Sequence, residues 1–129
     1  MKSIFFLSRI FLVSFFCYFS FLLMDVPVRA EGCDVYRTAE SMKGFADTLF
    51  YGDYLYRATM EYERFVYCYP AHPDIPKARF NIATAAQLVE DYPSALEYYQ
   101  TFLSLYPNHP LAENASCAVV EIEEKLAGR

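Results

Sequence analysis

The sequence predicts an all-α protein, a short α-solenoid of about two helical hairpins followed by one C-terminal helix. The first observation behind this prediction is a repeat. The segment Tyr69–Pro73 (Tyr-Pro-Ala-His-Pro) returns at Tyr106–Pro110 as Tyr-Pro-Asn-His-Pro, so that the proline at position 70 recurs 37 residues later at position 107. The second is that apolar residues recur at the spacing of one helix face, without any useful length of strand-like alternation. A fixed period of this size indicates a repeat array.

The first hairpin follows a short linker. From about Tyr36, apolar residues recur at helical spacing until Gly52, which breaks the helix. Asp53 is a suitable N-cap for a second helix, because its carboxylate can accept hydrogen bonds from free backbone N–H groups. We expect this second helix to run to about Tyr67, since the prolines that follow cannot continue it. These prolines are Pro70, Pro73 and Pro76.

The second hairpin and the last helix follow the same logic. A third helix is predicted to begin near Lys77, and the turn Glu90–Pro93 separates it from a fourth. Pro93 is tolerated there because the first turn of a helix does not use its missing N–H group. The fourth helix is predicted to end at Tyr106, before a proline, and a fifth to cover about Leu111–Leu126 with a strongly acidic outer face.

The first 30 residues have the three parts of a secretory signal peptide. A short basic start is followed by an apolar run from Ile10 to Met24 and by a polar exit that ends in Val28-Arg29-Ala30. We expect cleavage after Ala30, a linker over residues 31–38 and a repeat domain over residues 39–129. One alternative is an uncleaved anchor, because the apolar run approaches the roughly 20 residues that span a bilayer. In both cases the basic N-terminus stays inside and the rest of the chain crosses the membrane.

The cysteines leave two further possibilities open. Cys17 leaves with the leader, so an odd number of cysteines remains in a space that permits disulfides. Cys33 and Cys68 form the more plausible pair, because Cys117 lies a full repeat away from Cys68. Alternatively, Cys33 could carry lipid, as in bacterial lipoproteins, which are cut directly before a cysteine. Another reading is a small redox or metal protein that uses Cys33, Cys68, His72 and Cys117.

His72 is spaced from Cys68 as a metal ligand can be, but its counterpart His109 lies one whole hairpin away. Zinc needs three or four converging ligands, which favours histidines that form hydrogen bonds within the proline-rich turns.

Two helices per repeat, a small residue where they cross and a proline after the second helix resemble the tetratricopeptide repeat. The positions that match its alanine, aromatic and proline are expected to pack the repeats together. They are Ala58, Tyr62 and Pro70 in the first unit and Ala95, Tyr99 and Pro107 in the second. The period of 37 residues departs from the roughly 34 of the standard repeat. The longer Tyr-Pro-x-His-Pro connection resembles the repeats of bacterial envelope proteins, namely outer-membrane assembly lipoproteins and the periplasmic coordinator associated with the Tol-Pal system. The resemblance implies a periplasmic protein that binds other proteins.

The repeat alignment also predicts which residues line a partner-binding groove, because the first helix of each hairpin lines the concave side of stacked hairpins. The groove candidates are Lys43, Asp47, Phe50, Asn81, Thr84, Gln87, Leu88, Glu121 and Glu124. This polar groove with an acidic end suits an extended or helical segment that carries some positive charge. The large rings of Tyr56, Tyr67 and Tyr98 are expected to pack between helices.

The net charge and the motifs of the sequence limit the classes of function that the protein can have. The chain has 11 bases and 16 acids, of which three bases and one acid lie in the leader, leaving a formal charge of −7. An acidic surface argues against nucleic acid, and the sequence has neither a catalytic constellation nor a glycine-rich phosphate loop. We therefore predict a non-catalytic protein–protein adaptor of the bacterial cell envelope, without a cofactor. A lipid-anchored outer-membrane assembly component is the alternative, and a homodimer through the C-terminal helix is possible.

Overall fold

A computed structural model describes Cys33 and residues 37–128, so the expected leader (residues 1–30) and most of the linker lie outside the described residues. Residues 37–128 form five α-helices without a strand, which confirms the predicted all-α class. The helices are α2 (Ala39–Tyr51), α3 (Leu55–Cys68), α4 (Ile75–Leu88), α5 (Tyr92–Leu105) and α6 (Ala112–Ala127).

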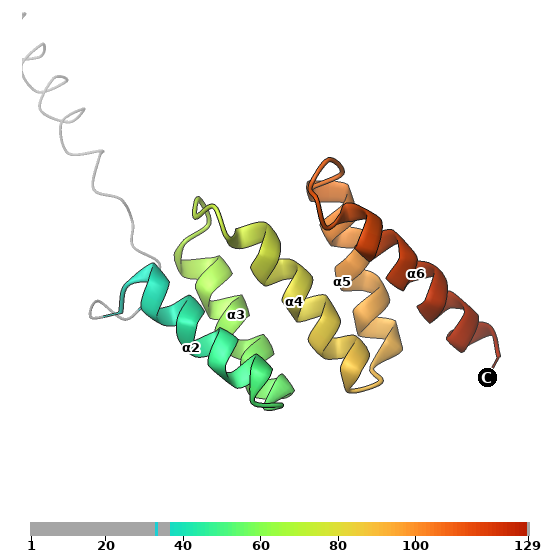
Figure 1. Cartoon of the computed structure of the whole chain (residues 1–129), viewed down its shortest axis with the longest axis horizontal. Helices are drawn as coiled ribbons and strands as arrows, with labels where there is room; N and C mark the ends of the chain where they lie inside the picture. The colour runs from blue at the N-terminus through green and yellow to red at the C-terminus, as the bar shows by residue number, and fades with distance from the viewer. Residues whose placement is uncertain (1–32, 34–36, 129) are drawn as a thin grey trace, which may run out of the picture.

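The helices pack in the order of the chain. Each of them lies chiefly against the next one, and α2 makes only a minor contact with α4. Figure 1 shows them side by side from α2 at one end to α6 at the other, with α2 in front of α3 and α6 in front of α5. Short connections between neighbours make consecutive helices antiparallel. The two end helices, α2 and α6, consequently each cover only one neighbour extensively.

The core repeats with the sequence. Ala58 and Ala95 are fully buried where helices cross, and Tyr62 and Tyr99 fill the space beside them. Pro70 and Pro107, which we expected among the packing residues, are exposed instead. Both prolines stand two residues after the last residue of a helix, α3 or α5, so they end these helices and contribute little to the core.

The proline-rich connections are also equivalent in detail. Nδ1 of His72 accepts a hydrogen bond from the backbone N–H of Asp74 at 3.1 Å, and Nδ1 of His109 accepts one from Leu111 at 3.1 Å. Each imidazole ring lies edge-on to the buried phenylalanine of the preceding helix, with ring centroids 5.2 and 5.7 Å apart. The prediction that the histidines form hydrogen bonds within the turns is confirmed.

The turns within the two hairpins differ from the sequence-based expectation. Asp53 is not an N-cap: its φ of 65° is left-handed, and α3 begins only at Leu55. Glu90, 37 residues later, has the same conformation with a φ of 61°. In both turns the next N–H reaches back to a carbonyl five residues earlier, as from Tyr54 to Leu49 at 2.9 Å. Each non-glycine residue thus occupies the left-handed position of a Schellman motif.

Pro76 also differs from its expected role. It lies inside the first turn of α4, which begins at Ile75 and not near Lys77. The first turn tolerates proline because its N–H groups have no intrahelical partner.

Glu90→Gly is expected to raise the free energy of unfolding by about 0.5–1 kcal/mol. A left-handed conformation costs a residue with a Cβ about 1–2 kcal/mol, and glycine removes this cost from the folded state. The gain in stability is smaller than this cost because glycine also raises the conformational entropy of the unfolded chain. Urea unfolding of the two proteins measures the difference. Asp53→Gly should gain less, because aspartate tolerates this conformation better than glutamate. Loss of stability in Glu90→Gly would contradict the assigned turn.

Candidate partner-binding surface

The first group of predicted groove residues is joined by a buried tyrosine. Tyr62, on α3, donates its hydroxyl hydrogen to Oδ1 of Asp47 on α2 at 2.5 Å. The same hydroxyl accepts a hydrogen bond from Nδ2 of Asn81 on α4 at 2.8 Å. The other oxygen of Asp47, Oδ2, accepts a hydrogen bond from Nζ of Lys43 at 2.7 Å. One tyrosine hydroxyl therefore fixes polar side chains of two helices that scarcely touch.

A second tyrosine connects α4 to the C-terminal part of the chain. The hydroxyl of Tyr99 lies 3.0 Å from Oγ1 of Thr84 and donates to Oε1 of Gln87 at 3.0 Å. Gln87 in turn donates to Glu121 on α6 at 3.4 Å, and Lys125 pairs with the other oxygen of Glu121 at 2.9 Å. We call the side chains Lys43, Asp47, Asn81, Thr84, Gln87 and Glu121, together with the two tyrosine hydroxyls, the polar row.

Within the polar row, the carboxylate of Asp47 is held by hydrogen bonds from two side chains. Burial raises the pKa of its carboxyl, but the hydrogen bonds from Lys43 and Tyr62 and the charge of Lys43 outweigh this, so the pKa lies below its usual value. The hydrogen bond to Asp47 raises the pKa of Lys43. The stabilising contribution of Asp47 is therefore present above its unfolded pKa and is lost as the pH falls through the lower folded value. At neutral pH the row presents a fixed carboxylate beside a fixed ammonium group.

Burial, followed by the Asp47 hydrogen bond, raises the pKa of Tyr62 far above its usual value. Burial likewise raises the pKa of Tyr99. Both tyrosines consequently keep their hydroxyl hydrogens at any physiological pH and act as neutral connectors.

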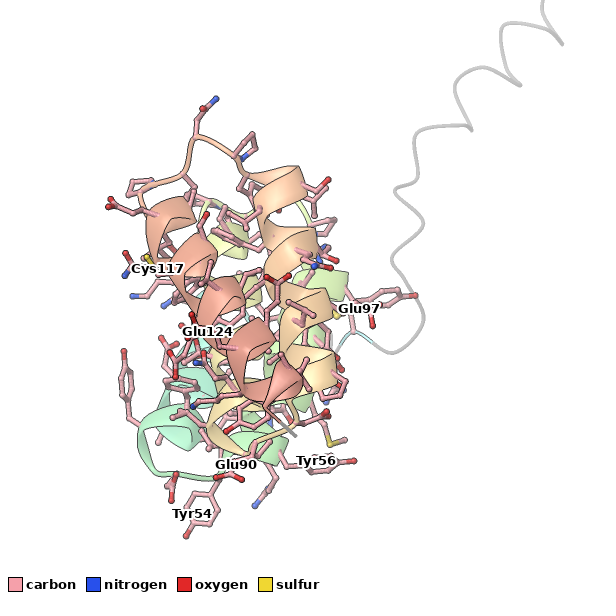
Figure 2. All side chains as sticks on the ribbon, turned by 90° about the vertical axis from the view of Figure 1, so that its right-hand side faces the viewer. Tyr54, Tyr56, Glu90, Glu97, Cys117 and Glu124 are labelled. Carbon is pink, nitrogen blue, oxygen red and sulfur yellow. A yellow bond between two sulfur atoms is a disulfide. The ribbon has the colours of Figure 1, made fainter. Side chains whose placement is uncertain are left out.

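Three predicted groove residues are not open polar contacts, whereas a fourth, Glu124, is exposed as expected. Asn81 is 9% exposed and serves Tyr62, so it is not an open contact point. Phe50 packs its ring edge-on to Tyr62 and lies partly buried against the core residues of α2, α3 and α4. Leu88 is exposed but lies at the end of α4, beside the α2–α3 turn rather than in the polar row. Glu124 is exposed on α6, where Figure 2 labels it.

The two tyrosines of the polar row were predicted from the sequence only as packing residues. Their rings are buried as expected, but their hydroxyls reach the polar row. A sequence signal for this existed. The period that pairs Tyr62 with Tyr99 also pairs Asp47 with Thr84, so each tyrosine has a polar partner at the same repeat position.

The remaining tyrosines divide between core and surface. Tyr98 is half-buried and packs between helices, as expected, against core residues of α2–α4 and of α4–α6. Tyr56 and Tyr67, which we expected to pack between helices, are 78% and 61% exposed. Tyr56 lies in the first turn of α3, and Figure 2 shows it with Tyr54 and Glu90 at one end of the molecule. Helical spacing alone did not reveal that these positions lie outside the hairpin contacts.

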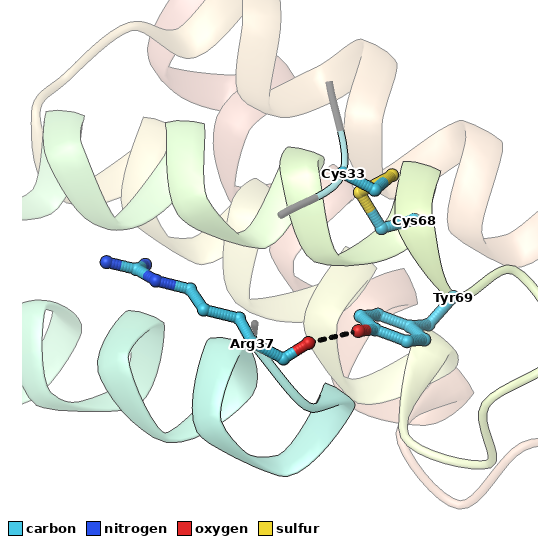
Figure 3. Close-up of a disulfide and its surroundings, with 4 residues drawn as sticks. All are labelled: Cys33, Arg37, Cys68 and Tyr69. Carbon is cyan, nitrogen blue, oxygen red and sulfur yellow. Dashed lines mark hydrogen bonds between the residues drawn. A yellow bond between two sulfur atoms is a disulfide. The ribbon is translucent and has the colours of Figure 1, made fainter. Parts of the chain in front are cut away.

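Cys33 and Cys68 form a disulfide, as predicted. Figure 3 shows it beside Tyr69, whose hydroxyl donates to the backbone carbonyl of Arg37 at 2.5 Å. These two links fasten the linker to the end of α3. Cys117 is free and exposed on α6, a helix that packs chiefly on α5. The structure therefore does not bring Cys117 together with Cys68 and His72.

In the part of the chain that the structure describes, no three His, Cys, Asp or Glu side chains are grouped as a metal site would require. Within the same residues, none of the helices has the length and apolar character needed to cross a bilayer.

Comparison with known proteins adds no relative. No protein-family model matches this chain, and no curated protein matches it. Inferences about function therefore rest on the residues themselves.

Tyr62→Phe is expected to lower the free energy of unfolding by about 1–3 kcal/mol, because it leaves the buried Nδ2 of Asn81 without an acceptor. Tyr99→Phe is the matched control in the second hairpin. Its partners Thr84 and Gln87 are half-exposed, so water can replace the lost hydroxyl and the cost should stay below about 1 kcal/mol. Urea denaturation of the three proteins measures both differences. Equal costs would show that Asn81 does not depend on Tyr62.

Proposed function

We propose that the protein is an exported, non-catalytic adaptor of the bacterial cell envelope. In this proposal the helices form a short tetratricopeptide-type α-solenoid that binds a segment of another protein along the polar row. The leader directs the chain across the membrane, and the repeat domain acts in the periplasm by contact alone.

The solenoid part of the proposal is supported by the repetition of structural detail at one offset. The buried alanines, the buried tyrosines with their polar partners, the histidine hydrogen bonds and the left-handed turn residues all recur 37 residues apart. Independent helices in a bundle have no reason to share such a set at a fixed period. Stacked copies of one hairpin do.

The observation that carries the binding proposal is a pair of hydrogen-bonded groups on one face of α4. One group joins α2 to α4 through Tyr62, and the other joins α4 to α6 through Gln87. Side chains held by hydrogen bonds lose little conformational entropy when a partner binds, which favours a preformed recognition surface. The row begins with a lysine–aspartate pair and ends at Glu121, with Glu124 exposed on the same helix. This charge pattern fits an extended or helical segment with positive charge near the α6 end.

The disulfide bears on the rival functions. A lipid attached through a thioether would use the sulfur of Cys33 that is bonded to Cys68 here, so the two modifications exclude one another. The redox alternative would need Cys117 close to the other cysteines, but Cys117 lies on α6. Both observations favour a free periplasmic adaptor over a lipid-anchored assembly component or a redox protein.

The experiment has two parts, of which the first determines the state of the chain. Intact mass and N-terminal sequence are measured on the protein recovered from soluble and membrane fractions of its host. A soluble product that starts at Glu31 with two hydrogens fewer than the reduced mass supports the proposal. A membrane-bound product that starts at a lipidated Cys33 contradicts it and supports the lipid-anchored alternative.

The second part tests the polar row. The native protein, the double variant Glu121→Lys/Glu124→Lys and the control Glu97→Lys are used to capture partners from envelope extract. Glu97 is an exposed glutamate of α5, which contributes only Tyr99 to the row. We expect one enriched partner that the double variant loses by about tenfold or more and the control retains. A partner held equally by all three proteins would place binding elsewhere.

A further inference from the structure

An open hollow of about 470 Å³ lies at the end of the molecule where α2 turns into α3 and where α4 ends. Four apolar side chains that line it are between 53% and 78% exposed, namely Tyr54, Tyr56, Leu88 and Val89. Figure 2 shows the two tyrosines at this end of the molecule. Asp53 and Arg57 line the same hollow, and we call the six residues together the turn patch. Contiguous exposed apolar side chains, unlike single ones, mark a contact surface.

The fold does not require the two tyrosines of the turn patch. In the second hairpin, 37 residues later, their positions are occupied by Asp91 and Pro93. Asp91 caps α5, because its carboxylate accepts a hydrogen bond from the backbone N–H of Ser94. Tyr54 precedes α3 at the same position but makes no such hydrogen bond. An exposed apolar ring where a polar cap would stabilise the helix indicates a role other than folding.

The turn patch carries charges of both signs that have no partner within the chain. Asp53 and Arg57 are exposed, and in residues 37–128 neither forms an ion pair with the other or with a third side chain. When two copies meet across a two-fold axis, residue i of each copy meets residue j of the other. Arg57 of each copy can therefore lie opposite Asp53 of the other, and Glu90 at the same end offers a second acid. The patch is complementary in charge to its own copy.

The size of the turn patch also suits a second copy. At their exposed fractions, the two tyrosines, the leucine and the valine present roughly 500 Å² per copy, to which the charged residues add. A standard interface takes about 800 Å² from each partner, and weaker contacts take less. The patch is therefore large enough for an association of about micromolar affinity.

We propose that the protein forms a two-fold symmetric homodimer through the turn patch. The tyrosine rings of each copy cover the exposed leucine and valine of the other, and Arg57 pairs with Asp53 across the axis. No side chain of the polar row lines the hollow, so both copies keep their polar rows open. The dimer therefore does not depend on the function proposed above and adds a second binding surface to the assembly.

The test is sedimentation velocity of the purified exported protein over a concentration series of about 1–200 μM, which brackets the expected affinity. The Cys33–Cys68 disulfide is kept intact, and Cys117 is alkylated so that its free thiol cannot link two chains. We expect monomers at the low end of the series and dimers at the high end. A protein that stays monomeric throughout the series overturns the proposal.

The double variant Tyr54→Asp/Tyr56→Ser tests the apolar part of the contact. It installs the N-cap residue of the second hairpin before α3, so it should stay folded by far-UV circular dichroism and should weaken dimerisation by about tenfold or more. Val120→Lys replaces an exposed apolar side chain of α6 and is the control, which should dimerise as the native protein does. If only the control loses the dimer, the C-terminal helix is the contact and the turn patch is not.

Exchanging the charges tests the two-fold symmetry. In a homodimer, Arg57→Glu and Asp53→Lys each place like charges opposite one another, so each variant alone should be monomeric where the native protein is dimeric. An equimolar mixture of the two variants restores both pairs of opposite charge and should form a heterodimer. Asp53→Lys should fold, because Glu90 shows that this left-handed turn position accepts a long side chain. A mixture that stays monomeric, or single variants that dimerise as the native protein does, would contradict the proposed pairing.

Discussion

Phe102→Ala is expected to lower the free energy of unfolding by about 3–5 kcal/mol, a large part of the stability of a domain of this size. Phe102 is fully buried on α5 and its ring meets three others, those of Phe80, Tyr106 and His109, at centroid distances between 5.5 and 5.7 Å. Removing it leaves a void among rings that cannot collapse together without moving the α5–α6 connection. Urea denaturation followed by far-UV circular dichroism measures the loss.

Two control variants show whether the effect of Phe102→Ala depends on burial in the core. Phe65→Ala should cost a similar amount, because Phe65 holds Tyr69 and His72 in the first hairpin as Phe102 holds their counterparts. Leu105→Ala, also in α5, should cost less than about 1 kcal/mol, since this leucine is 52% exposed. A small effect in Phe102→Ala, comparable to that of Leu105→Ala, would contradict the assigned core.

Loss of the disulfide is expected to lower the free energy of unfolding by about 2–4 kcal/mol. The bond joins residues separated by 35 positions, so it removes the entropy of a long loop from the unfolded chain. Reduction of the native protein and the variant Cys68→Ala should give similar losses in urea unfolding. Cys117→Ala is the matched control and should change stability by less than about 0.5 kcal/mol, because Cys117 is free and exposed.

The reduction experiment also distinguishes the effect of losing the covalent bond from the effect of shortening the side chain at position 68. A reductant should lower the stability of the native protein and leave Cys68→Ala unchanged. If reductant has no effect on the native protein, the chain in solution does not form the Cys33–Cys68 bond, and the lipid-anchored alternative gains support.

The sequence predicted the helical class, the number of helices and the residues at the helix crossings because these features repeat. A buried alanine opposite a buried tyrosine is a local pattern, and its recurrence after 37 residues excludes coincidence. The disulfide was predicted by counting cysteines and by the distance that one repeat imposes. These are properties of spacing, which a sequence records directly.

Other features depend on directions in space that spacing does not record. The left-handed residues Asp53 and Glu90 are ordinary in composition, so nothing local distinguished a Schellman turn from an N-cap. The exposure of Tyr67 depends on which side of α3 is left open by α4 and α5. The same holds for Asn81, whose burial follows from the reach of a tyrosine on another helix.

The disulfide has a mechanical consequence. If the leader or a partner holds the N-terminal end of the chain while a second contact pulls on α6, tension entering at Cys33 passes through the covalent bond to Cys68. The segment between them, which contains α2 and α3, then lies outside the path of the force. The load falls instead on the connection that begins at Tyr69 and on the contacts of α4 and α5. Stretched between two attachment points, the oxidised chain would extend first at its C-terminal half, while its first hairpin stays folded.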